Sequence, residues 1–288
     1  MVASGYSPRG LRWLFRAIRS RERAWMPVEN AGFVLGFVWQ VFASIPLTLR
    51  HYRSQTMRVI TDMTWGRDSV IVGGGTVPML AVLGVAMGVG AGIESFATLD
   101  MLGMGPLTGI VSSFANTREL APIAAGIGFA AQAGCRMTAE IGSMRIAEEI
   151  DAIESLGLRS LPLVVTTRVI AGAVAIVPTF LVALILAYLS CRTVVVVLHG
   201  QAAGVYDHYF FQFVSGWDML AAVLKVVVFT VAVILIHCYQ GFFATGGPEG
   251  VGIASGRAVR ASFVAIIALD MVLSVAVWGF HSAIEFTG

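Results

Sequence analysis

Long apolar runs, separated by short charged stretches, dominate the hydropathy pattern of the chain. Ser69–Ile93 is a run of 25 residues that carries no charge, whereas about 20 apolar residues suffice to span the hydrocarbon core of a bilayer. Three later runs have a comparable length: Val169–Cys191, Asp218–Gln240 and Ala261–Ile284. We predict a transmembrane helix in each of these four runs.

A fifth apolar segment, Leu99–Ala139, is too long for one simple crossing and is interrupted by the adjacent charges Arg118 and Glu119. Basic residues gather at its end and beyond it, at Arg136, Arg145 and Arg159. Because basic residues favour the cytoplasmic side, we expect this segment to return the chain to the cytoplasm. The pattern therefore predicts five crossings.

The first 68 residues differ from the rest and are predicted to be a basic cytoplasmic tail with interfacial or elbow helices. From Arg9 to Arg23 the arginines recur at steps of three and four, which is typical either of a surface helix on anionic headgroups or of a disordered basic tail. Val28–Leu49 is apolar and aromatic but broken by Gln40 and Pro46, which favours an in-plane or elbow helix. Residues 69–288 would form the membrane domain.

Composition supports this fold class. The chain is 57% hydrophobic and 12% charged, whereas a soluble domain has about 25% charged residues, so lipid must be the solvent for most of it. Ten of the nineteen basic residues precede Ser69. The first 27 residues are basic but contain no apolar core before Pro27, which argues against a cleaved signal peptide. We expect an all-α, multi-pass protein of the plasma (inner) membrane, with a cytoplasmic amino terminus and an external carboxyl terminus.

One charge-dense stretch, Glu140–Gly157, follows the second crossing. Its acids recur at three-residue steps, at Glu148, Asp151 and Glu154, and its apolar positions form a stripe of Ile146, Ile150, Ile153 and Leu156. The spacing predicts an amphipathic cytoplasmic helix of four or five turns that stops at Gly157. Such a helix is either a solvated connector or a docking element for another protein's groove, and we favour docking.

The chain lacks the motifs of catalysis. Its one lysine, Lys225, follows Leu224, so no Walker A phosphate loop can form. No HExxH, GxSxG or Asp-rich metal loop is present, and the three cysteines are too far apart for a CxxC pair. The arginines are not interleaved with stacking aromatics on a polar face, which argues against nucleic-acid binding. We expect no catalytic residue, no metal site and no cofactor in this chain.

Four charged residues fall at membrane depth. Arg118 and Glu119 are adjacent, hence about 100° apart on a helix. They could take part in lipid-headgroup binding or gating; alternatively, they could form a structural salt bridge. Asp270 lies roughly 14 Å inside the last crossing, and Lys225 is a possible partner, with a stem that could snorkel to the outer surface. For Lys225 and Asp270 we favour a structural role over proton coupling.

Several motifs together resemble the permease subunits of MlaE and YrbE type. They are Arg118-Glu119-Leu120-Ala121-Pro122, Ala139-Glu140-Ile141-Gly142, Met144-Arg145, the acidic run from Glu148 to Glu154, and Leu269-Asp270. The resemblance covers nearly the whole chain after about residue 50. It makes residues 69–288 the permease domain, with a coupling helix near residues 143–157.

The resemblance implies an ABC-type transporter of a fatty acid, sterol or other lipid. Two permease chains would pair beneath a hexamer of MCE-domain proteins, and two ATPase subunits would bind ATP and Mg and supply the energy. The residues implied to couple to the ATPase are Arg145, Glu148, Glu149, Asp151, Glu154 and Gly157.

Glycines recur every fourth residue in the first crossing, at Gly84, Gly88 and Gly92. Their default interpretation is tight helix pairing. The resemblance suggests a second one, in which Gly84 and Gly88 help to line a lipid-sized cavity at the permease dimer interface. Both interpretations can hold at different points along the helix.

One departure from the family pattern concerns the partner chain. Where MlaE-type chains carry an arginine one turn earlier, this chain has Gln132 and places Arg136 four residues later. Together with the Arg-rich amino terminus, this looks like the second (B-type) of the two YrbE paralogues in actinobacterial Mce complexes, which implies a heterodimer.

Two rival functions remain open at the sequence level. An ion- or proton-coupled secondary transporter of an apolar solute would use Arg118, Glu119, Lys225 and Asp270 and would need no partner, although no internal repeat is visible. A lipid-modifying membrane enzyme would need a clustered His, Asp or Ser constellation that the chain does not display.

Overall fold

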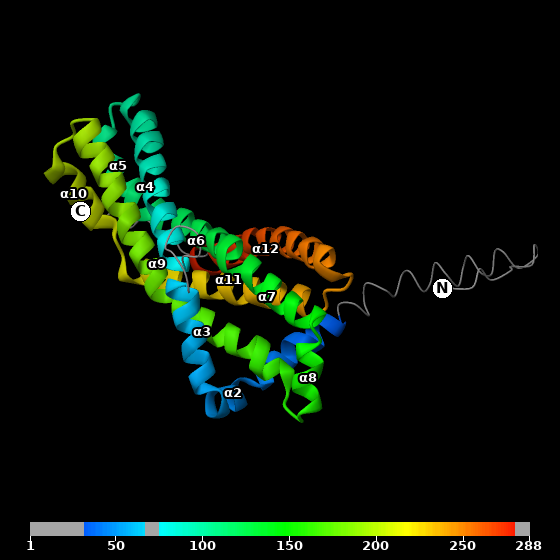
Figure 1. Ribbon diagram of the computed structural model, residues 1–288. Coiled ribbons are helices and arrows are strands. Elements are labelled where there is room, and N and C mark those ends of the chain that lie inside the picture. Colours follow the sequence, from blue (N-terminus) through cyan, green and yellow to red (C-terminus); the bar gives the residue numbers. More distant parts are fainter. Residues whose placement is uncertain (1–31, 67–74, 280–288) are drawn as a thin grey trace, which may run out of the picture.

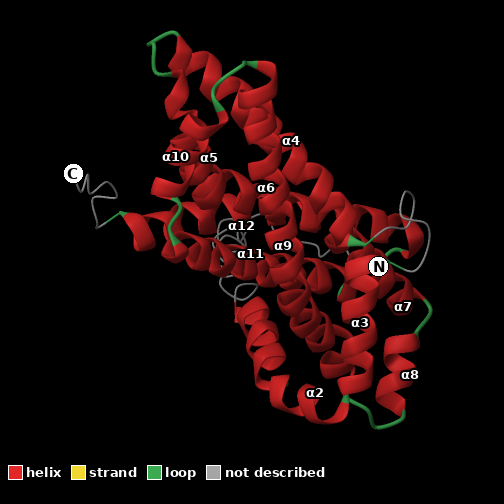
Figure 2. Cartoon of the chain, turned by 90° about the vertical axis from the view of Figure 1, so that its left-hand side faces the viewer, coloured by secondary structure: helices red, strands yellow, loops and turns green. Residues whose placement is uncertain are grey.

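The computed structural model describes residues 32–66 and 75–279. Every regular element in this part of the chain is a helix, as Figure 2 shows, which confirms the all-α prediction. The predicted basic surface helix between Arg9 and Arg23 lies outside the described residues, as does the end of the last crossing beyond Gly279.

The elements follow one another along the chain in a simple order. A first helix covers Gly32–Ala43. The α-helices after it are α2 (Ile45–His51), α3 (Arg53–Trp65), α4 (Thr76–Asp100), α5 (Thr108–Ala115), α6 (Ala121–Phe129), α7 (Cys135–Ile146), α8 (Glu149–Ser155), α9 (Thr167–Thr193), α10 (Ala203–Phe213), α11 (Gly216–Phe242) and α12 (Gly247–Trp278). Four π-helical segments, Asn116–Leu120, Ala130–Gly134, Pro162–Thr166 and Val194–Leu198, continue neighbouring α-helices.

Four helices in the described part are long and apolar enough to cross a membrane: α4, the 37-residue helix Pro162–Leu198, α11 and α12. The first helix and α2 make a fifth candidate if they are counted as one bent span. They meet at 40°, and this bend lies in the segment predicted to form an in-plane or elbow helix. The helix of the first crossing, α4, extends past the predicted end at Ile93 to Asp100.

The predicted crossing Leu99–Ala139 takes the form of one rod from Thr108 to Ile146, built from α5, α6 and α7 and two π-helical segments. In Figure 1 this rod runs from the end of the molecule that holds α10 to the end that holds α8. It is not one of the four helices that are long and apolar enough to cross a membrane, so the return of the chain to the cytoplasm through this segment stays a prediction. Arg118 lies in its first π-helical segment and Gln132 in its second.

The glycine-bearing face of α4 packs against α9. A Cβ atom at Gly84 would overlap the carbonyl oxygen of Ala183, and one at Gly88 would overlap that of Ala187. At Gly92 it would lie 3.2 Å from the carbonyl oxygen of Cys191. The tight helix pairing predicted from these glycines is thus present within one chain.

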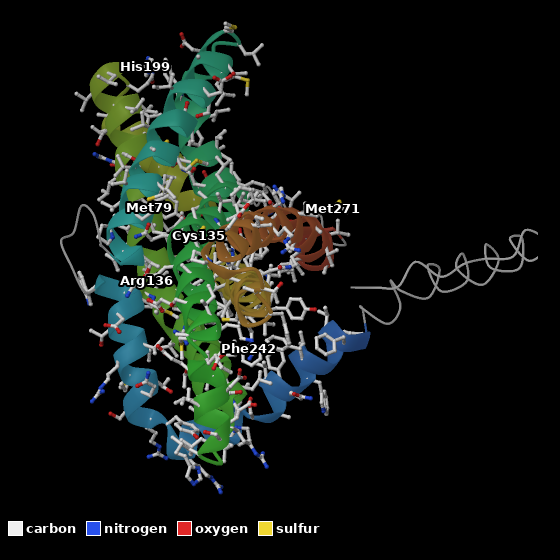
Figure 3. The ribbon with its side chains drawn as sticks, turned by 45° about the vertical axis from the view of Figure 1, so that its right-hand side comes forward. Met79, Cys135, Arg136, His199, Phe242 and Met271 are labelled. Carbon is white, nitrogen blue, oxygen red and sulfur yellow. The ribbon has the colours of Figure 1, made fainter. Side chains whose placement is uncertain are left out.

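Helix α11 lies at the centre of the core. Its buried face contacts α7, α9 and α12. Aromatic rings attach the first helix to the end of α11, where Phe37 lies 5.4 Å from Tyr239 and 6.4 Å from Phe242 between ring centroids. Figure 3 shows Phe242 beside that helix, and Met271 on the outer face of α12. Met271 is 65% exposed, as expected of a face in contact with lipid.

Candidate functional site

Arg118 is paired with a residue of another helix. Its Nε and Nη2 atoms donate hydrogen bonds of 3.0 and 2.8 Å to Oδ2 of Asp218 on α11. The other carboxylate oxygen of Asp218 accepts a hydrogen bond of 2.8 Å from Nε1 of Trp278. The guanidinium group also stacks 3.6 Å from the ring centroid of Phe114. Both charges are therefore buried and satisfied within the bundle.

Lys225 forms the second half of the same cluster. Its ammonium group lies 2.7 Å from Oδ1 of Asp270 and 3.2 Å from Oε2 of Glu119. It also donates to the backbone oxygen of Arg118 at 2.7 Å and to Oγ of Ser274 at 2.9 Å. The prediction that Lys225 snorkels is wrong, because four oxygen atoms surround the ammonium inside the bundle, where Lys225 is 1% exposed.

The cluster joins the π-helical segment Asn116–Leu120 to α11 and α12. Arg118 and Glu119 pair with different helices, as their separation on a helix requires. Two cations face three carboxylates here, so the formal charge is one negative unit (2 − 3 = −1). The structure thus contains interhelical salt bridges, which were one of the two roles predicted for Arg118 and Glu119. Sequence reasoning took Asp218 only as the start of a crossing, and Ser274 and Trp278 carried no signal of their own.

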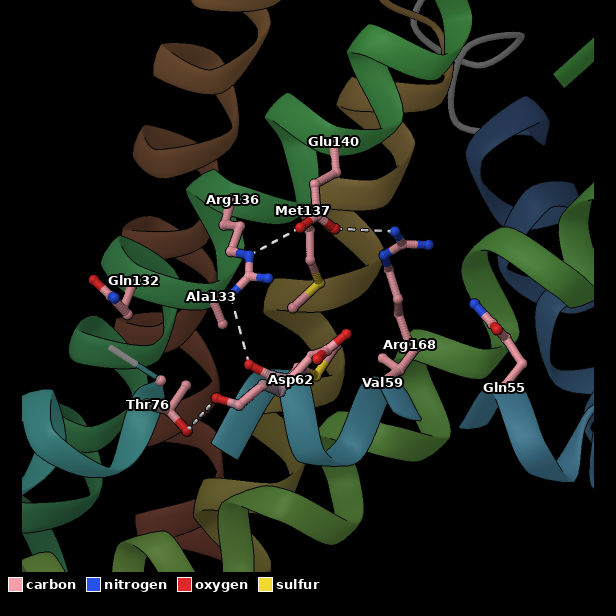
Figure 4. A pocket seen from close by; sticks show the side chains of 12 residues that line it. Gln55, Val59, Asp62, Thr76, Gln132, Ala133, Arg136, Met137, Glu140 and Arg168 are labelled. Carbon is pink, nitrogen blue, oxygen red and sulfur yellow. Dashed lines mark hydrogen bonds and ion pairs between the residues drawn. The ribbon is translucent and has the colours of Figure 1, made fainter. Parts of the chain in front are cut away.

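A second polar cluster, shown in Figure 4, joins α3, α7 and α9. Glu140 accepts hydrogen bonds from Nε of Arg136 at 2.8 Å and from Nη2 of Arg168 at 3.1 Å. Arg136 also reaches the backbone oxygen of Asp62 at 3.5 Å. The cluster borders a cavity of about 70 Å³ that Gln132 also lines. Arg136, identified above as a departure from the family pattern, therefore ties the elbow region to the bundle.

Glu140 lies near the end of the rod and is part-buried between two arginines. Its side chain is 38% exposed, and that of Arg168 is 13% exposed. Arg168 was not singled out in the sequence, since its partner lies 28 residues away.

The acidic segment is not the single helix that its spacing predicts. Helix α7 ends at Ile146, and α8 begins at Glu149. Between them Glu148 adopts a left-handed conformation with φ 57°, the one positive φ among the described non-glycine residues. The break turns the chain so that Ile150 is buried, and Arg145 closes the turn through an ion pair of 2.7 Å with Asp151. The prediction of a continuous helix of four or five turns is wrong because this burial outweighs helix continuation.

The break also divides the apolar stripe. Ile150 is 1% exposed and Ile153 packs against the core, whereas Ile146 is 42% exposed and Leu156 is 77% exposed. Gly157 ends the segment with φ +76°. The four acids of the segment, Glu148, Glu149, Asp151 and Glu154, are all exposed. Helix α8 thus presents an acidic surface with an apolar end to its surroundings.

The other candidate residues lie outside these clusters. Gly84 and Gly88 lie in the contact between α4 and α9, so they would line a cavity only if those helices moved apart. In the described part of the chain, no group of three or more His, Cys, Asp or Glu side chains could hold a metal ion.

Comparison with known proteins agrees with this architecture. The family Permease MlaE matches residues 66–276. The chloroplastic protein TRIGALACTOSYLDIACYLGLYCEROL 1 of Arabidopsis thaliana is 30% identical over 182 residues, which cover 63% of this chain and 52% of the plant protein. The chain thus spans about half the length of this relative.

Two bacterial relatives are covered more fully. A Rickettsia bellii protein named "Probable ABC transporter permease protein" is 27% identical over 70% of this chain and 78% of its own. The "Intermembrane phospholipid transport system permease protein MlaE" of Haemophilus influenzae is 25% identical over 70% of this chain and 77% of its own. With a family match that extends from the end of α3 almost to the end of α12, the chain is a multi-pass membrane protein that belongs to the MlaE permease family.

Proposed function

We propose that the chain is the permease subunit of an ATP-driven, MCE-type lipid transporter of the inner membrane. Its family and the names of its relatives, an ABC transporter permease and a phospholipid transport permease, support this function. The chain itself would catalyse no covalent step, and ATP and Mg would bind to a partner. The cargo would be a fatty acid, a sterol or another lipid.

The single observation that carries the proposal is the exposed acidic surface of α8. Ile150 anchors the helix in the core, while Glu148, Glu149, Asp151 and Glu154 face outward. An amphipathic element that is anchored on one side and charged on the other is suited to dock in a groove of a second protein. Leu156, which is 77% exposed next to the acids, supplies an apolar anchor for that groove.

Contacts within the chain connect α8 to the helices of the membrane domain. The ion pair between Arg145 and Asp151 and the burial of Ile150 connect α8 to α7, and α7 is the end of the rod that carries Arg118 and Glu119. A partner ATPase that closes on nucleotide would push on α8 and shift this rod against α11 and α12. Two arrangements of the rod, biased by nucleotide and by lipid, would then alternate.

The proposed assembly contains two permease chains, two ATPase subunits and a hexamer of MCE-domain proteins. A second YrbE-type chain would form a heterodimer with this one, and the cargo would pass between the two. Arg118 and Glu119 would act in gating by exchanging partners in the buried cluster, and Lys225 with Asp270 would hold α11 and α12 together. The amino terminus would be cytoplasmic and the carboxyl terminus external.

Charge reversal on α8 tests the proposal. We expect the chain to copurify with an ATPase subunit, and the double variant Glu148→Lys and Glu149→Lys to lose that subunit. Glu249→Lys is the matched control, because Glu249 is an exposed acid in the first turn of α12. An ATPase that stays bound to the double variant as well as to the control variant would contradict docking at α8.

A second measurement addresses the mode of energy supply. Lipid movement by the reconstituted assembly should depend on ATP hydrolysis. Transport by the purified chain without a nucleotide-hydrolysing partner would instead favour a secondary transporter that uses the buried cluster.

A further inference from the structure

A groove lies where the elbow meets the connection between α8 and α9. One wall comes from the end of the first helix and from α2, and the other from the residues that precede the membrane-spanning part of α9. The groove has a volume of about 560 Å³. Its apolar lining consists of Ala43, Leu47, Leu158, Leu161 and Pro162. Figures 1 and 2 both place α2 and α8 at the same end of the molecule.

Two features near the groove are typical of a membrane–water boundary. The 37-residue apolar helix begins at Pro162, which lines the groove. The first helix exposes Phe33, Trp39 and Phe42, and Trp39 is 75% exposed. Exposed aromatic side chains of this kind are enriched at the headgroup level of a bilayer. The predicted topology, in which α8 is cytoplasmic, would put this boundary on the cytoplasmic side.

The charges at the groove favour an anion. Arg159 lines it and is exposed, and no residue of the described part of the chain forms an ion pair with Arg159. Glu154 also lines the groove and keeps its negative charge, while its Oε1 accepts a hydrogen bond of 2.5 Å from Oγ of Ser160. Arg50, one helical turn beyond Leu47 on α2, adds a second exposed cation nearby.

We propose that this groove binds one anionic phospholipid of the cytoplasmic leaflet, with its phosphate at Arg159 and an acyl chain along the apolar wall. A free phosphate ion would use Arg159 but would leave the apolar wall exposed to water, so a lipid satisfies both parts of the groove. The lipid would touch the elbow on one side and the residues that follow α8 on the other. It would therefore join the membrane surface to the acidic α8 surface, at a place separate from any path between two permease chains.

The proposal requires a membrane location and does not depend on the transport function. The test is native mass spectrometry of the full-length chain, extracted with its associated subunits, during titration with phosphatidylglycerol or phosphatidylcholine. We expect one phosphatidylglycerol molecule per chain to be retained in preference to phosphatidylcholine. Arg159→Gln should lower the occupancy by phosphatidylglycerol about fivefold, as expected for the loss of one basic residue at an anionic surface.

Three further variants complete the experiment. Arg159→Lys should retain phosphatidylglycerol, and Leu47→Trp should reduce the binding of both lipids because it fills the groove. Arg257→Gln removes an exposed arginine of α12 and is the matched control, with no expected loss. Equal retention by Arg159→Gln and the wild-type chain would overturn the proposal, and so would equal loss in Arg159→Gln and Arg257→Gln. Displacement of the bound lipid by millimolar inorganic phosphate alone would overturn the assignment of the groove to a lipid.

Discussion

Removal of the buried ammonium group of Lys225 should destabilise the bundle strongly. Lys225 is 1% exposed and lies within 2.7 Å of Asp270 and 3.2 Å of Glu119. The variant Lys225→Met keeps the length and the apolar stem of the side chain but leaves two carboxylates without their shared cation. Breaking a buried ion pair by removing one partner costs about 3 to 5 kcal/mol, and we expect a loss of this size.

A double-mutant cycle separates this pair from general packing. Asp270→Asn alone should cost about 1 to 3 kcal/mol, because Lys225 keeps Glu119, Ser274 and the backbone oxygen of Arg118 as acceptors. The combined variant should cost less than the sum of the two, since Asp270→Asn removes one of the carboxylates that Lys225→Met leaves unpaired.

The assay is reversible unfolding in mixed micelles, followed by tryptophan fluorescence, for the wild-type chain, both single variants and the double variant. We expect a coupling energy of at least about 1 kcal/mol between the two sites. Additive effects, or a cost for Lys225→Met below about 1 kcal/mol, would refute the reasoning that the cluster stabilises the bundle through charge pairing.

Two other predictions concern helix packing and pH. Gly88→Leu should force α4 away from α9 and lower the unfolding temperature in detergent by several degrees. The control Gly90→Leu should change this temperature little, because Gly90 faces open space. Equal effects in the two variants would contradict the packing of α4 on α9. The two hydrogen bonds from Arg192, of 2.7 and 2.8 Å, hold the pKa of Asp207 below its usual value, so their stabilising effect is present at neutral pH and is lost as the pH falls through that lowered pKa. Both side chains are partly exposed, so the effect is below about 1 kcal/mol. The labelling rate of a cysteine introduced on α10, divided by that of a small free thiol at the same pH, should rise at low pH in the wild-type chain, and Asp207→Asn should abolish this rise.

Much of the fold could be predicted from local features of the sequence. The length and hydropathy of the apolar runs predict membrane helices, because a bilayer accepts few other backbone structures. The fourfold spacing at Gly84 and Gly88 predicts the contact with another helix, although only the structure identifies α9 as that helix. Likewise Asp270 at membrane depth predicts a cationic partner, and the one lysine of the chain is that partner.

The acidic segment shows where local periodicity is insufficient. Spacing alone predicts an unbroken helix from Glu140 to Gly157, because a period of three to four residues carries no information about long-range burial. The break at Glu148 arises since Ile150 reaches the core only if the chain turns there. The exposure of Leu156 and of the acids follows from the same turn.

The sequence by itself thus determined the membrane class, the four long apolar helices and the family resemblance, all of which depend on residue types within a helix. Only the tertiary structure decided the partners of the buried charges. Arg118 and Asp218 are 100 residues apart, and Glu140 takes hydrogen bonds from both α7 and α9. Such pairs depend on the depth and rotation of one helix relative to another, and those are set by the packing of the whole bundle.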